Sequence, residues 1–265
     1  MSFSHLLSGG IAGTMSASIL APFDVVKTRM QSSEFQGGLY TTTKQILKKD
    51  GFKGFYRGLS PTLMGTIPSK SIYFFIYNKS KETFHPKLGD NIQSNALSAT
   101  CAGLSVTLCT NPLWAIRTRL QLSTTKQTLL KVCKELYLEK GLRAFYVGAG
   151  VSTFGTIESA IQFGLYEEFK RYELSPFVSG SISKLIASTL MYPHEVIRTR
   201  LRQKNAKYSG ILNTAVRIVR EEGYLNLYSG CTAHLMRTVP NAALMLTFYE
   251  LINTFLNEEA VRTSK

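Results

Sequence analysis

Ten residues near the start of the chain, Pro22-Phe-Asp-Val-Val-Lys-Thr-Arg-Met-Gln31, recur twice further along it. The second copy is Pro112-Leu-Trp-Ala-Ile-Arg-Thr-Arg-Leu-Gln121, and the third is Pro193-His-Glu-Val-Ile-Arg-Thr-Arg-Leu-Arg202. The prolines of successive copies lie 90 and 81 residues apart. Self-similarity at a nearly constant period indicates that one structural unit is repeated along the chain.

A second pattern follows each copy at a constant distance. It reads Gly51-Phe-Lys-Gly-Phe-Tyr56-Arg-Gly58, then Gly141-Leu-Arg-Ala-Phe-Tyr146-Val-Gly148, then Gly223-Tyr-Leu-Asn-Leu-Tyr228-Ser-Gly230. The first glycine lies 29, 29 and 30 residues after the proline, so both patterns keep register through all three copies. Prolines and glycines that merely punctuate loops would not keep this spacing. We therefore predict three copies of one module.

Six apolar segments, two in each module, are long enough to cross a membrane, because about 20 helical residues span the hydrocarbon core. They cover residues 5–31, 58–77, 92–121, 145–166, 176–202 and 229–256. Hydrophobic residues make up 44% of the chain and charged residues 18%, yet the mean hydropathy is only −0.00. The segments must therefore be amphipathic. Ionisable residues inside them are tolerated where they face a bundle interior or a water-filled cavity, which predicts a polar central pathway.

The net charge of +14 admits nucleic acid, anionic lipid or an anionic small molecule as a partner. The basic residues recur singly beside prolines, glycines and aromatic residues, which favours membrane edges and a cavity over nucleic acid. The four cysteines and four histidines show no metal-binding or disulfide spacing, and no glycine-rich phosphate loop is present. We therefore expect no enzyme activity, cofactor or metal. The N-terminal segment lacks the features of a signal peptide, so any targeting information is expected to be internal.

The two repeated patterns resemble those of the mitochondrial carrier family, over essentially the whole chain and in all three copies. The resemblance implies an all-α membrane protein with six transmembrane helices in three pseudo-symmetric repeats and short matrix helices. The repeats would cover residues 1–86, 87–174 and 175–265. It further implies a monomer in the mitochondrial inner membrane that transports its substrate by alternating access.

The first pattern predicts a gate at one mouth of the pathway. Asp24, Lys27 and Gln31 are spaced i, i+3 and i+7, so they share one face of a helix whose proline can turn its end toward the bundle axis. The acid and base of three such helices can pair between neighbours, which resembles the matrix-side gate of the family. The resemblance assigns to this gate Asp24, Lys27, Gln31, Trp114, Arg117, Gln121, Glu195 and Arg198.

This gate departs from the family pattern in its second and third copies. Trp114 occupies the position of the second acid, so at most two of the three ion pairs can form and one base is left over. Arg202 occupies the position of the third glutamine and cannot brace the gate as glutamine does. We expect a weaker and more positive gate, which suits an anionic substrate.

A second family gate, on the cytoplasmic side, reads aromatic, acid, any, any, base near the ends of the even-numbered helices. Only Tyr166-Glu167-Glu-Phe-Lys170 fits it fully. The residues that remain for this gate are Lys81, Glu167, Lys170 and Glu250, so it too is expected to be incomplete. The alternative is that these are ordinary charged side chains at helix ends that reach toward the membrane surface.

The second pattern resembles family positions at which helix N-termini bind the phosphates of cardiolipin. Free backbone N–H groups and the helix dipole favour an anion there. The residues concerned are Gly51, Tyr56, Gly58, Gly141, Tyr146, Gly148, Gly223, Tyr228 and Gly230. The alternative is that the glycines simply mark helix starts.

Family members meet their substrate at mid-membrane on the even-numbered helices. The candidate substrate-binding residues are Gly65, Thr66, Lys70, Gly155, Thr156, Ser159, Lys184, Arg237 and Asn241. Arg237 is the strongest candidate, because a lone arginine deep in a membrane helix can hold phosphate or carboxylate with two parallel hydrogen bonds. The alternative is an ion pair of Arg237 with Glu158 or Glu250.

Local matches narrow the substrate to a nucleotide-type anion. Asn111-Pro-Leu-Trp114 resembles the branch that carries pyrimidine nucleotides, NAD, FAD and folate. Pro68-Ser-Lys70, Glu158 and Arg237-Thr-Val-Pro-Asn241 look most like pyrimidine nucleotide carriers, whereas Ala160-Ile-Gln-Phe163 looks closer to NAD carriers. We rank pyrimidine nucleotides first and NAD or a flavin or folate substrate second. A non-transporting receptor or scaffold with the carrier fold is the reading from another class.

Overall fold

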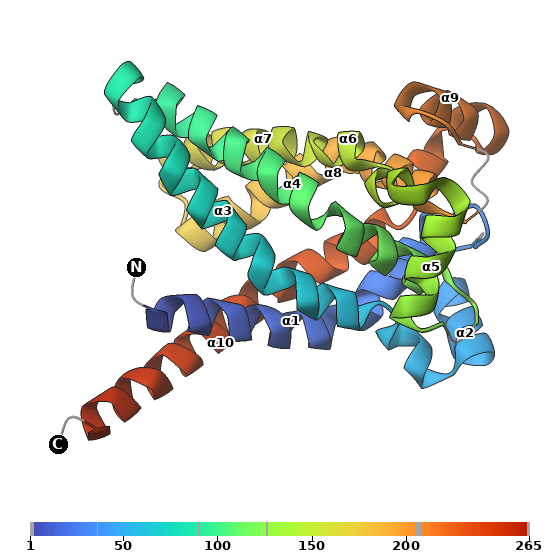
Figure 1. Cartoon of the computed structure of the whole chain (residues 1–265), viewed down its shortest axis with the longest axis horizontal. Coiled ribbons are helices and arrows are strands. Elements are labelled where there is room, and N and C mark those ends of the chain that lie inside the picture. Colours follow the sequence, from blue (N-terminus) through green and yellow to red (C-terminus); the bar gives the residue numbers. More distant parts are fainter. Residues whose placement is uncertain (1–2, 36, 90, 126, 205–207, 264–265) are drawn as a thin grey trace.

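The computed structural model describes residues 3–35, 37–89, 91–125, 127–204 and 208–263, and all regular secondary structure within them is helical. The elements are α1 (Phe3–Met30), α2 (Leu39–Asp50), η1 (Phe52–Tyr56), α3 (Leu59–Leu88), α4 (Ile92–Leu122), α5 (Leu129–Lys140), η2 (Gly141–Tyr146), α6 (Ala149–Ser152), α7 (Phe154–Arg171), α8 (Pro176–Arg202), α9 (Ile211–Glu222), η3 (Tyr224–Tyr228) and α10 (Cys231–Thr263). The predicted all-α class is confirmed. In Figure 1 the short helices α2, α5 and α9 gather at one end, and both termini lie at the other.

Each module contributes one long helix, a short helix, a 3-10 turn and a second long helical segment, in that order. The first long helices, α1, α4 and α8, continue through Pro22, Pro112 and Pro193 to the end of the repeated motif. The fourth long segment differs from the expected continuous helix, because α6 and α7 are separated by Thr153. Thr153 keeps helical torsion angles of −66° and −23°, so the chain continues in nearly the same direction.

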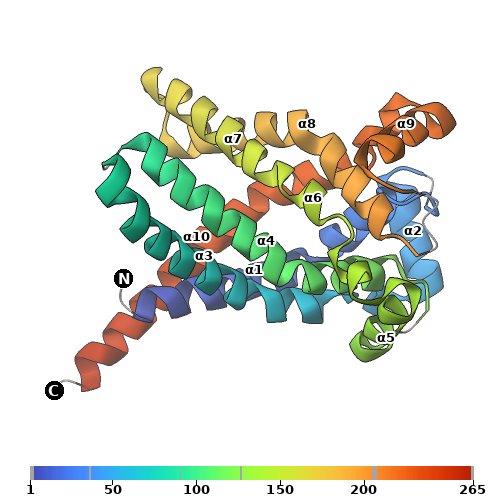
Figure 2. The same cartoon turned by 45° about the horizontal axis from the view of Figure 1, so that its top comes forward.

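The long helices form a ring in which neighbours come from different modules. The closest packing joins α3 to α4, α7 to α8, and α10 back to α1. Figures 1 and 2 show these helices converging toward the short helices and spreading apart toward the termini. The ring is therefore narrow at the short-helix end.

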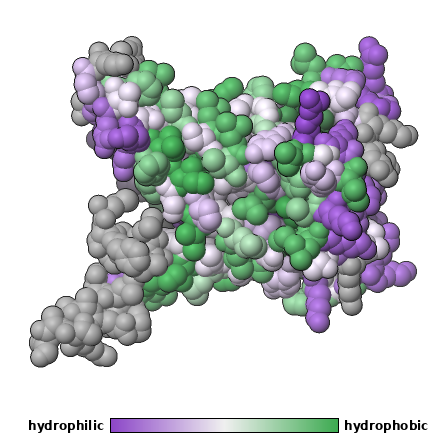
Figure 3. Space-filling view, in the orientation of Figure 1, coloured by the Kyte–Doolittle hydropathy of each residue, from purple (hydrophilic) through white to green (hydrophobic). Residues whose placement is uncertain are grey.

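The outer face of the ring is apolar. Large side chains such as Leu108 and Leu190 are 56% and 60% exposed, and Figure 3 shows hydrophobic residues along the long helices with hydrophilic ones toward both ends of the molecule. Exposed apolar surface of this extent is typical of contact with lipid. By length and composition alone, among the described residues, only Gly9–Met30 reaches the hydropathy of a membrane-spanning helix. The polar residues of the remaining long helices lower their averages, as the amphipathic pattern predicts.

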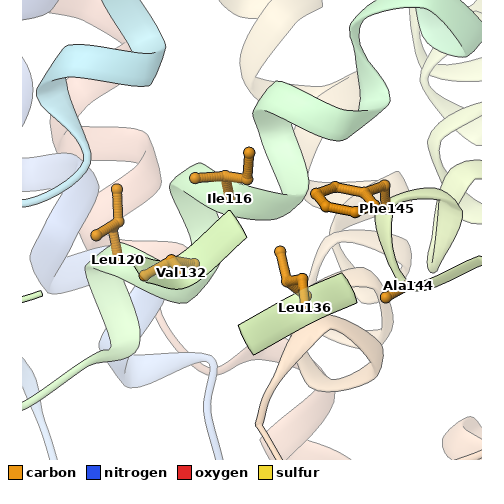
Figure 4. Close-up of a cluster of buried hydrophobic side chains, with 6 residues drawn as sticks. All are labelled: Ile116, Leu120, Val132, Leu136, Ala144 and Phe145. Atoms are coloured by element: carbon orange, nitrogen blue, oxygen red, sulfur yellow. The ribbon is translucent and has the colours of Figure 1, made fainter. Parts of the chain in front are cut away.

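Each short helix is held by a small apolar core against the end of its own module's first long helix. In the second module the core consists of Ile116 and Leu120 from α4, Val132 and Leu136 from α5, and Phe145 with Ala144 from η2 (Figure 4). The corresponding cores in the other two modules are built around Ile46 and Ile218, both fully buried. This packing fixes the short helices to the narrow end of the ring.

The first glycine of the second pattern ends each short helix. Gly51, Gly141 and Gly223 have φ values of 66°, 58° and 89°, and each donates its backbone N–H to a carbonyl in the last turn of α2, α5 or α9. Positive φ favours glycine, so these positions are helix C-caps. They terminate α-helices and lead into short 3-10 turns.

The second glycine has a packing role. A methyl group at Gly230 would lie 2.9 Å from the carbonyl oxygen of Lys27, and one at Gly58 would lie 3.0 Å from that of Arg117. At Gly148 the methyl group would lie 3.6 Å from the carbonyl oxygen of Arg198. Gly58 and Gly230 therefore let the second long segment of one module touch the first long helix of the next, at the level of its gate base, whereas the space at Gly148 is an ordinary van der Waals contact.

Candidate functional site

Two ion pairs join the first long helices of different modules at the narrow end of the ring. Arg117 of α4 donates to Asp24 of α1 across 2.7 Å, and Lys27 of α1 pairs with Glu195 of α8. In both pairs the acid of one module meets the base of the module that follows it in the ring. The helix face that these residues share, read from the sequence, accounts for this convergence.

No third inter-module pair forms among the gate residues, because the second module offers an indole. Trp114 donates its ring N–H to Thr110 on its own helix, and its ring lies 5.4 Å from the guanidinium of Arg117. Within the described residues, the acidic partner of Arg198, the remaining base, is Glu195 of its own helix, at 3.5 Å. The cation–π contact with Arg117 and the hydrogen bond to Thr110 hold the indole in place of an acid.

The last position of the repeated motif carries glutamine twice and arginine once. Gln31 donates to the hydroxyl of Tyr192 at 2.9 Å and accepts from Thr199, so it ties α1 to α8. Gln121 accepts from Thr28 at 2.9 Å and ties α4 to α1. The third position, Arg202, makes a different contact, which is described next.

Arg202 reaches back into the second module. Its guanidinium donates to the side-chain oxygen of Asn111 at 2.6 Å and to the carbonyl oxygens of Val147 and Trp114 at 3.3 and 3.5 Å. Only 6% of the residue is exposed. All of these acceptors are neutral, so its charge is balanced by dipoles alone.

A second set of contacts, which the sequence analysis missed, closes the narrow end. Arg29 of α1 pairs with Asp50 of α2 at 2.6 Å and donates its Nε to the carbonyl oxygen of Gln121 at 3.0 Å. The same arrangement recurs for Arg119 with Glu139 and the carbonyl of Arg202, and for Arg200 with Glu222 and the carbonyl of Gln31. We call Arg29, Arg119 and Arg200 the arginine ring. An acid one or two residues before each first glycine was the available sequence signal.

Above the ion pairs lies a cavity of about 340 Å³. Its charged lining consists of Asp24, Lys27, Arg117, Glu195, Arg198, Arg202 and Arg237. Five bases thus face two acids, which leaves an excess of positive charge. Such a concave, electropositive site of about 300–1,000 Å³ is suited to a small anion.

Arg237 is the predicted substrate residue that lines this cavity. Its Nε lies 2.8 Å from the second carboxylate oxygen of Asp24, so Asp24 holds both Arg117 and Arg237. The alternative pairing of Arg237 with Glu158 or Glu250 is wrong, because α10 brings Arg237 beside α1. Because Asp24 and Arg237 lie in the first and third modules, no local sequence pattern could have predicted their pairing.

The other predicted substrate residues lie outside this cavity. Lys70 donates to the carbonyl oxygen of Gly9 at 2.9 Å, and Lys184 pairs with Glu158 at 2.7 Å. The remaining ones are distributed along three helices: Gly65 and Thr66 on α3, Gly155, Thr156 and Ser159 on α7, and Asn241 on α10. Gly65 packs near the indole of Trp114, where a methyl group would lie 3.7 Å from the ring.

The residues predicted for the second gate are apart from one another. Glu167, Lys170 and Glu250 are exposed, and Lys81 is partly exposed. Within the described part of the chain, no ion pair joins any two of these four residues. Ion pairs between modules thus close the short-helix end. The four residues predicted for the second gate form no such pairs with one another in the described part of the chain.

Two helix N-termini of successive modules face a second cavity of about 410 Å³. Gly58, which precedes α3, lies on one side, and Thr128, which precedes α5, lies on the other. Lys53 and Arg57 also line it. Among the residues that the structure describes, no cluster of His, Cys, Asp and Glu could hold a metal ion.

The family model for mitochondrial carrier proteins matches the chain three times, over residues 1–88, 89–176 and 172–260. The chain belongs to the mitochondrial carrier family. Members of this family are transporters, and membership places this carrier in the mitochondrial inner membrane as a multi-pass protein.

Relatives match the carrier over nearly its whole length. Solute carrier family 25 member 36-A of Danio rerio is 38% identical, covering 96% of this chain and 97% of its own. Solute carrier family 25 member 33 of Homo sapiens is 35% identical, covering 96% and 95%. Nicotinamide adenine dinucleotide transporter 2, mitochondrial, of Arabidopsis thaliana is 36% identical, covering 95% and 79%.

Proposed function

We propose that this carrier exchanges pyrimidine nucleotides across the inner membrane by alternating access. The observation that carries the proposal is the cavity above the matrix gate, whose five bases and two acids include Arg237. A nucleotide carries several negative charges on its phosphates, and the positively charged cavity can bind them. The resemblance of Arg237-Thr-Val-Pro-Asn241 and Pro68-Ser-Lys70 to pyrimidine nucleotide carriers selects the substrate within that class.

Arg237 is the group that binds substrate phosphate. In the absence of substrate, Asp24 neutralises it at 2.8 Å. A phosphate that binds the Arg237 fork competes with Asp24, and the same carboxylate also holds Arg117 of the gate. Substrate binding therefore acts on an acid of the matrix gate, and the binding energy offsets the loss of gate contacts.

The two gates open in turn. The matrix gate consists of Asp24, Lys27, Gln31, Trp114, Arg117, Gln121, Glu195 and Arg198, and it is closed by the two inter-module ion pairs. The cytoplasmic gate consists of Lys81, Glu167, Lys170 and Glu250, which come together only when the matrix gate opens. Each gate has fewer than three pairs, so the barrier to switching is low.

The test is transport by purified protein in liposomes. Vesicles are loaded with unlabelled nucleotide and scored for exchange of labelled UTP, TTP, CTP, ATP, NAD, FAD and folate. We expect the pyrimidine nucleotides to exchange fastest and Arg237→Gln to abolish their exchange, because phosphate loses its main partner. Lys79→Gln, which removes an exposed base at 70% side-chain exposure, is the matched control. Absence of pyrimidine nucleotide exchange by the wild-type protein would refute the proposal.

NAD is the second candidate. It is favoured by the 36% identity to a nicotinamide adenine dinucleotide transporter and by the Ala160-Ile-Gln-Phe163 match. The same liposome panel separates the two candidates, because it measures exchange of NAD and of each pyrimidine nucleotide separately. A carrier-fold receptor would exchange none of the panel.

Cardiolipin is the proposed lipid partner. The cavity between Gly58 and Thr128 joins two helix N-termini with Lys53, a combination that favours an anionic headgroup, while Arg57 in the same lining pairs with Asp50 at 2.8 Å. Added cardiolipin is expected to raise the unfolding temperature of the protein in detergent more than a neutral lipid does. Lys53→Gln should reduce that increase. An equal effect of both lipids would count against the site.

The proposed transport unit is a monomer of three repeats, 1–86, 87–174 and 175–265. Its support is that the cavity lies inside a single ring of helices and is lined by all three modules.

A further inference from the structure

The positive charge of the matrix-gate cavity is unevenly distributed. Both acids in its lining are already engaged: Asp24 contacts Arg117 and Arg237, and Glu195 pairs with Lys27. The excess charge therefore lies with the bases that those two acids do not neutralise.

Arg198 is the least neutralised base of the gate. In the part of the chain that the structure describes, its one contact with an acid is 3.5 Å long, within its own helix, to a carboxylate that Lys27 already shares. Its side chain is 30% exposed, and it lines the cavity. The guanidinium is thus both accessible from the cavity and short of negative charge.

Arg202 lies one helical turn below Arg198 and adds to the excess. It is buried, and its contacts within the described residues are the neutral oxygens of Asn111, Val147 and Trp114. Both arginines lie against the backbone around Gly148. A buried charge without an acid is expensive, and a nearby anion reduces that penalty.

The ring symmetry identifies where an anion is expected. In both observed pairs the acid of one module meets the base of the next, so the acid at position 114 would meet Arg198. Trp114 stands there, and Arg198 consequently lacks the partner that Lys27 and Arg117 have.

We propose that Arg198 is a second anion subsite, which binds the terminal phosphate of the substrate. This inference rests on the proposed function and identifies which nucleotides the carrier prefers. The fork of Arg198 binds phosphate oxygens through parallel hydrogen bonds, and Arg202 beneath it contributes positive potential. The substrate itself then supplies the negative charge that Trp114 does not. Di- and triphosphates reach this subsite in addition to Arg237, so they bind more tightly than monophosphates.

The experiment measures the dependence of affinity on phosphate number. Exchange of labelled UMP, UDP and UTP is measured in liposomes for wild type, Arg198→Gln and Arg220→Gln, the last being an exposed arginine on α9. We expect Arg198→Gln to raise the KM for UTP about tenfold or more, because a charge-assisted hydrogen bond contributes that much. The KM for UMP should change by no more than about threefold. Arg220→Gln should change neither.

A second pair of variants tests the subsite without removing Arg198. The side chains introduced by Trp114→Asp and Trp114→Asn have nearly the same size, and only the aspartate carries a negative charge. The aspartate pairs with Arg198 and competes with the terminal phosphate, so it should raise the KM for UTP relative to UMP. The asparagine should raise it much less.

The outcomes separate the two proposals. If the wild-type protein exchanges none of the three nucleotides, the proposed function fails and this inference fails with it. If it exchanges them but Arg198→Gln affects UMP and UTP equally, the function stands and the second subsite is refuted. Equal effects of Trp114→Asp and Trp114→Asn would refute it as well.

Discussion

Trp114 lies where the ring symmetry calls for an acid, against the guanidinium of Arg117 and near Gly65 of the neighbouring helix. The matrix gate consequently closes with two inter-module pairs. Both follow from the sequence, because the repeated motif fixes which residues share a helix face. Their role in gating stays a prediction.

Restoring the missing acid should slow transport. Trp114→Asp adds a third pair, with Arg198, to the closed matrix gate. A partly exposed ion pair contributes about 1 kcal/mol, so the maximal exchange rate should fall roughly fivefold. Trp114→Asn is the control for loss of the indole. An aspartate variant that exchanges as fast as the asparagine variant would contradict the assignment.

The second glycine of each module should resist substitution. In Gly230→Ala the new methyl group meets the carbonyl of Lys27 and the hydroxyl of Tyr192, at a residue whose φ is +81°. Overpacking of this kind destabilises a protein by about 1–3 kcal/mol, so unfolding in detergent should begin several degrees lower. Gly210→Ala, which has a similar φ of +76° and nothing within 4 Å, is the matched control. Equal unfolding temperatures for the two variants would argue against the packing role.

At the scale of the elements, each arginine of the arginine ring links the short helix of its own module to the backbone of another module. Arg200 makes two hydrogen bonds of 2.6 Å with Glu222 of α9 and one of 2.6 Å with the carbonyl of Gln31. The residue is 1% exposed. One side chain thus connects three elements.

Removing it should weaken the narrow end of the ring. Arg200→Gln leaves the carboxylate of Glu222 partly buried without its partner, which destabilises by about 3–5 kcal/mol. Arg217→Gln on α9 breaks a more exposed pair with Glu221 and should lower stability by less than about 1 kcal/mol. Thermal unfolding of both purified variants measures the difference. A difference below about 1 kcal/mol would exclude the ring as a major contributor.

The elements themselves were largely predictable, and their contacts less so. Apolar segments of constant spacing predicted the six long helical stretches. They did not predict the interruption at Thr153, because Thr153 keeps helical torsion angles and no helix-breaking residue marks the site. The arginine ring escaped prediction for a physical reason. Each arginine of the ring donates to a backbone carbonyl of another module. Because every residue has a backbone carbonyl, no pattern of side chains in the sequence identifies these acceptors. The pair of Arg237 with Asp24 escaped because it joins the sixth long helix to the first.

For the whole molecule, three modules in one chain enclose one cavity, which predicts independent transport units. Wild type and inactive Arg237→Gln are reconstituted together at increasing ratios and a constant total amount. If the unit is a monomer, exchange should fall in direct proportion to the wild-type fraction. A fall with the square of that fraction would indicate an obligate dimer.

The carbonyl acceptors of the arginine ring also explain how this molecule tolerates an unequal third module. The three acceptor residues are Gln31, Gln121 and Arg202, yet each offers the same main-chain oxygen to the arginine of its neighbour. A mutation at such a position removes the side-chain contacts of that residue but leaves its main-chain oxygen available to the arginine of its neighbour. The charge at residue 202 can therefore change while the backbone contact with Arg119 is kept.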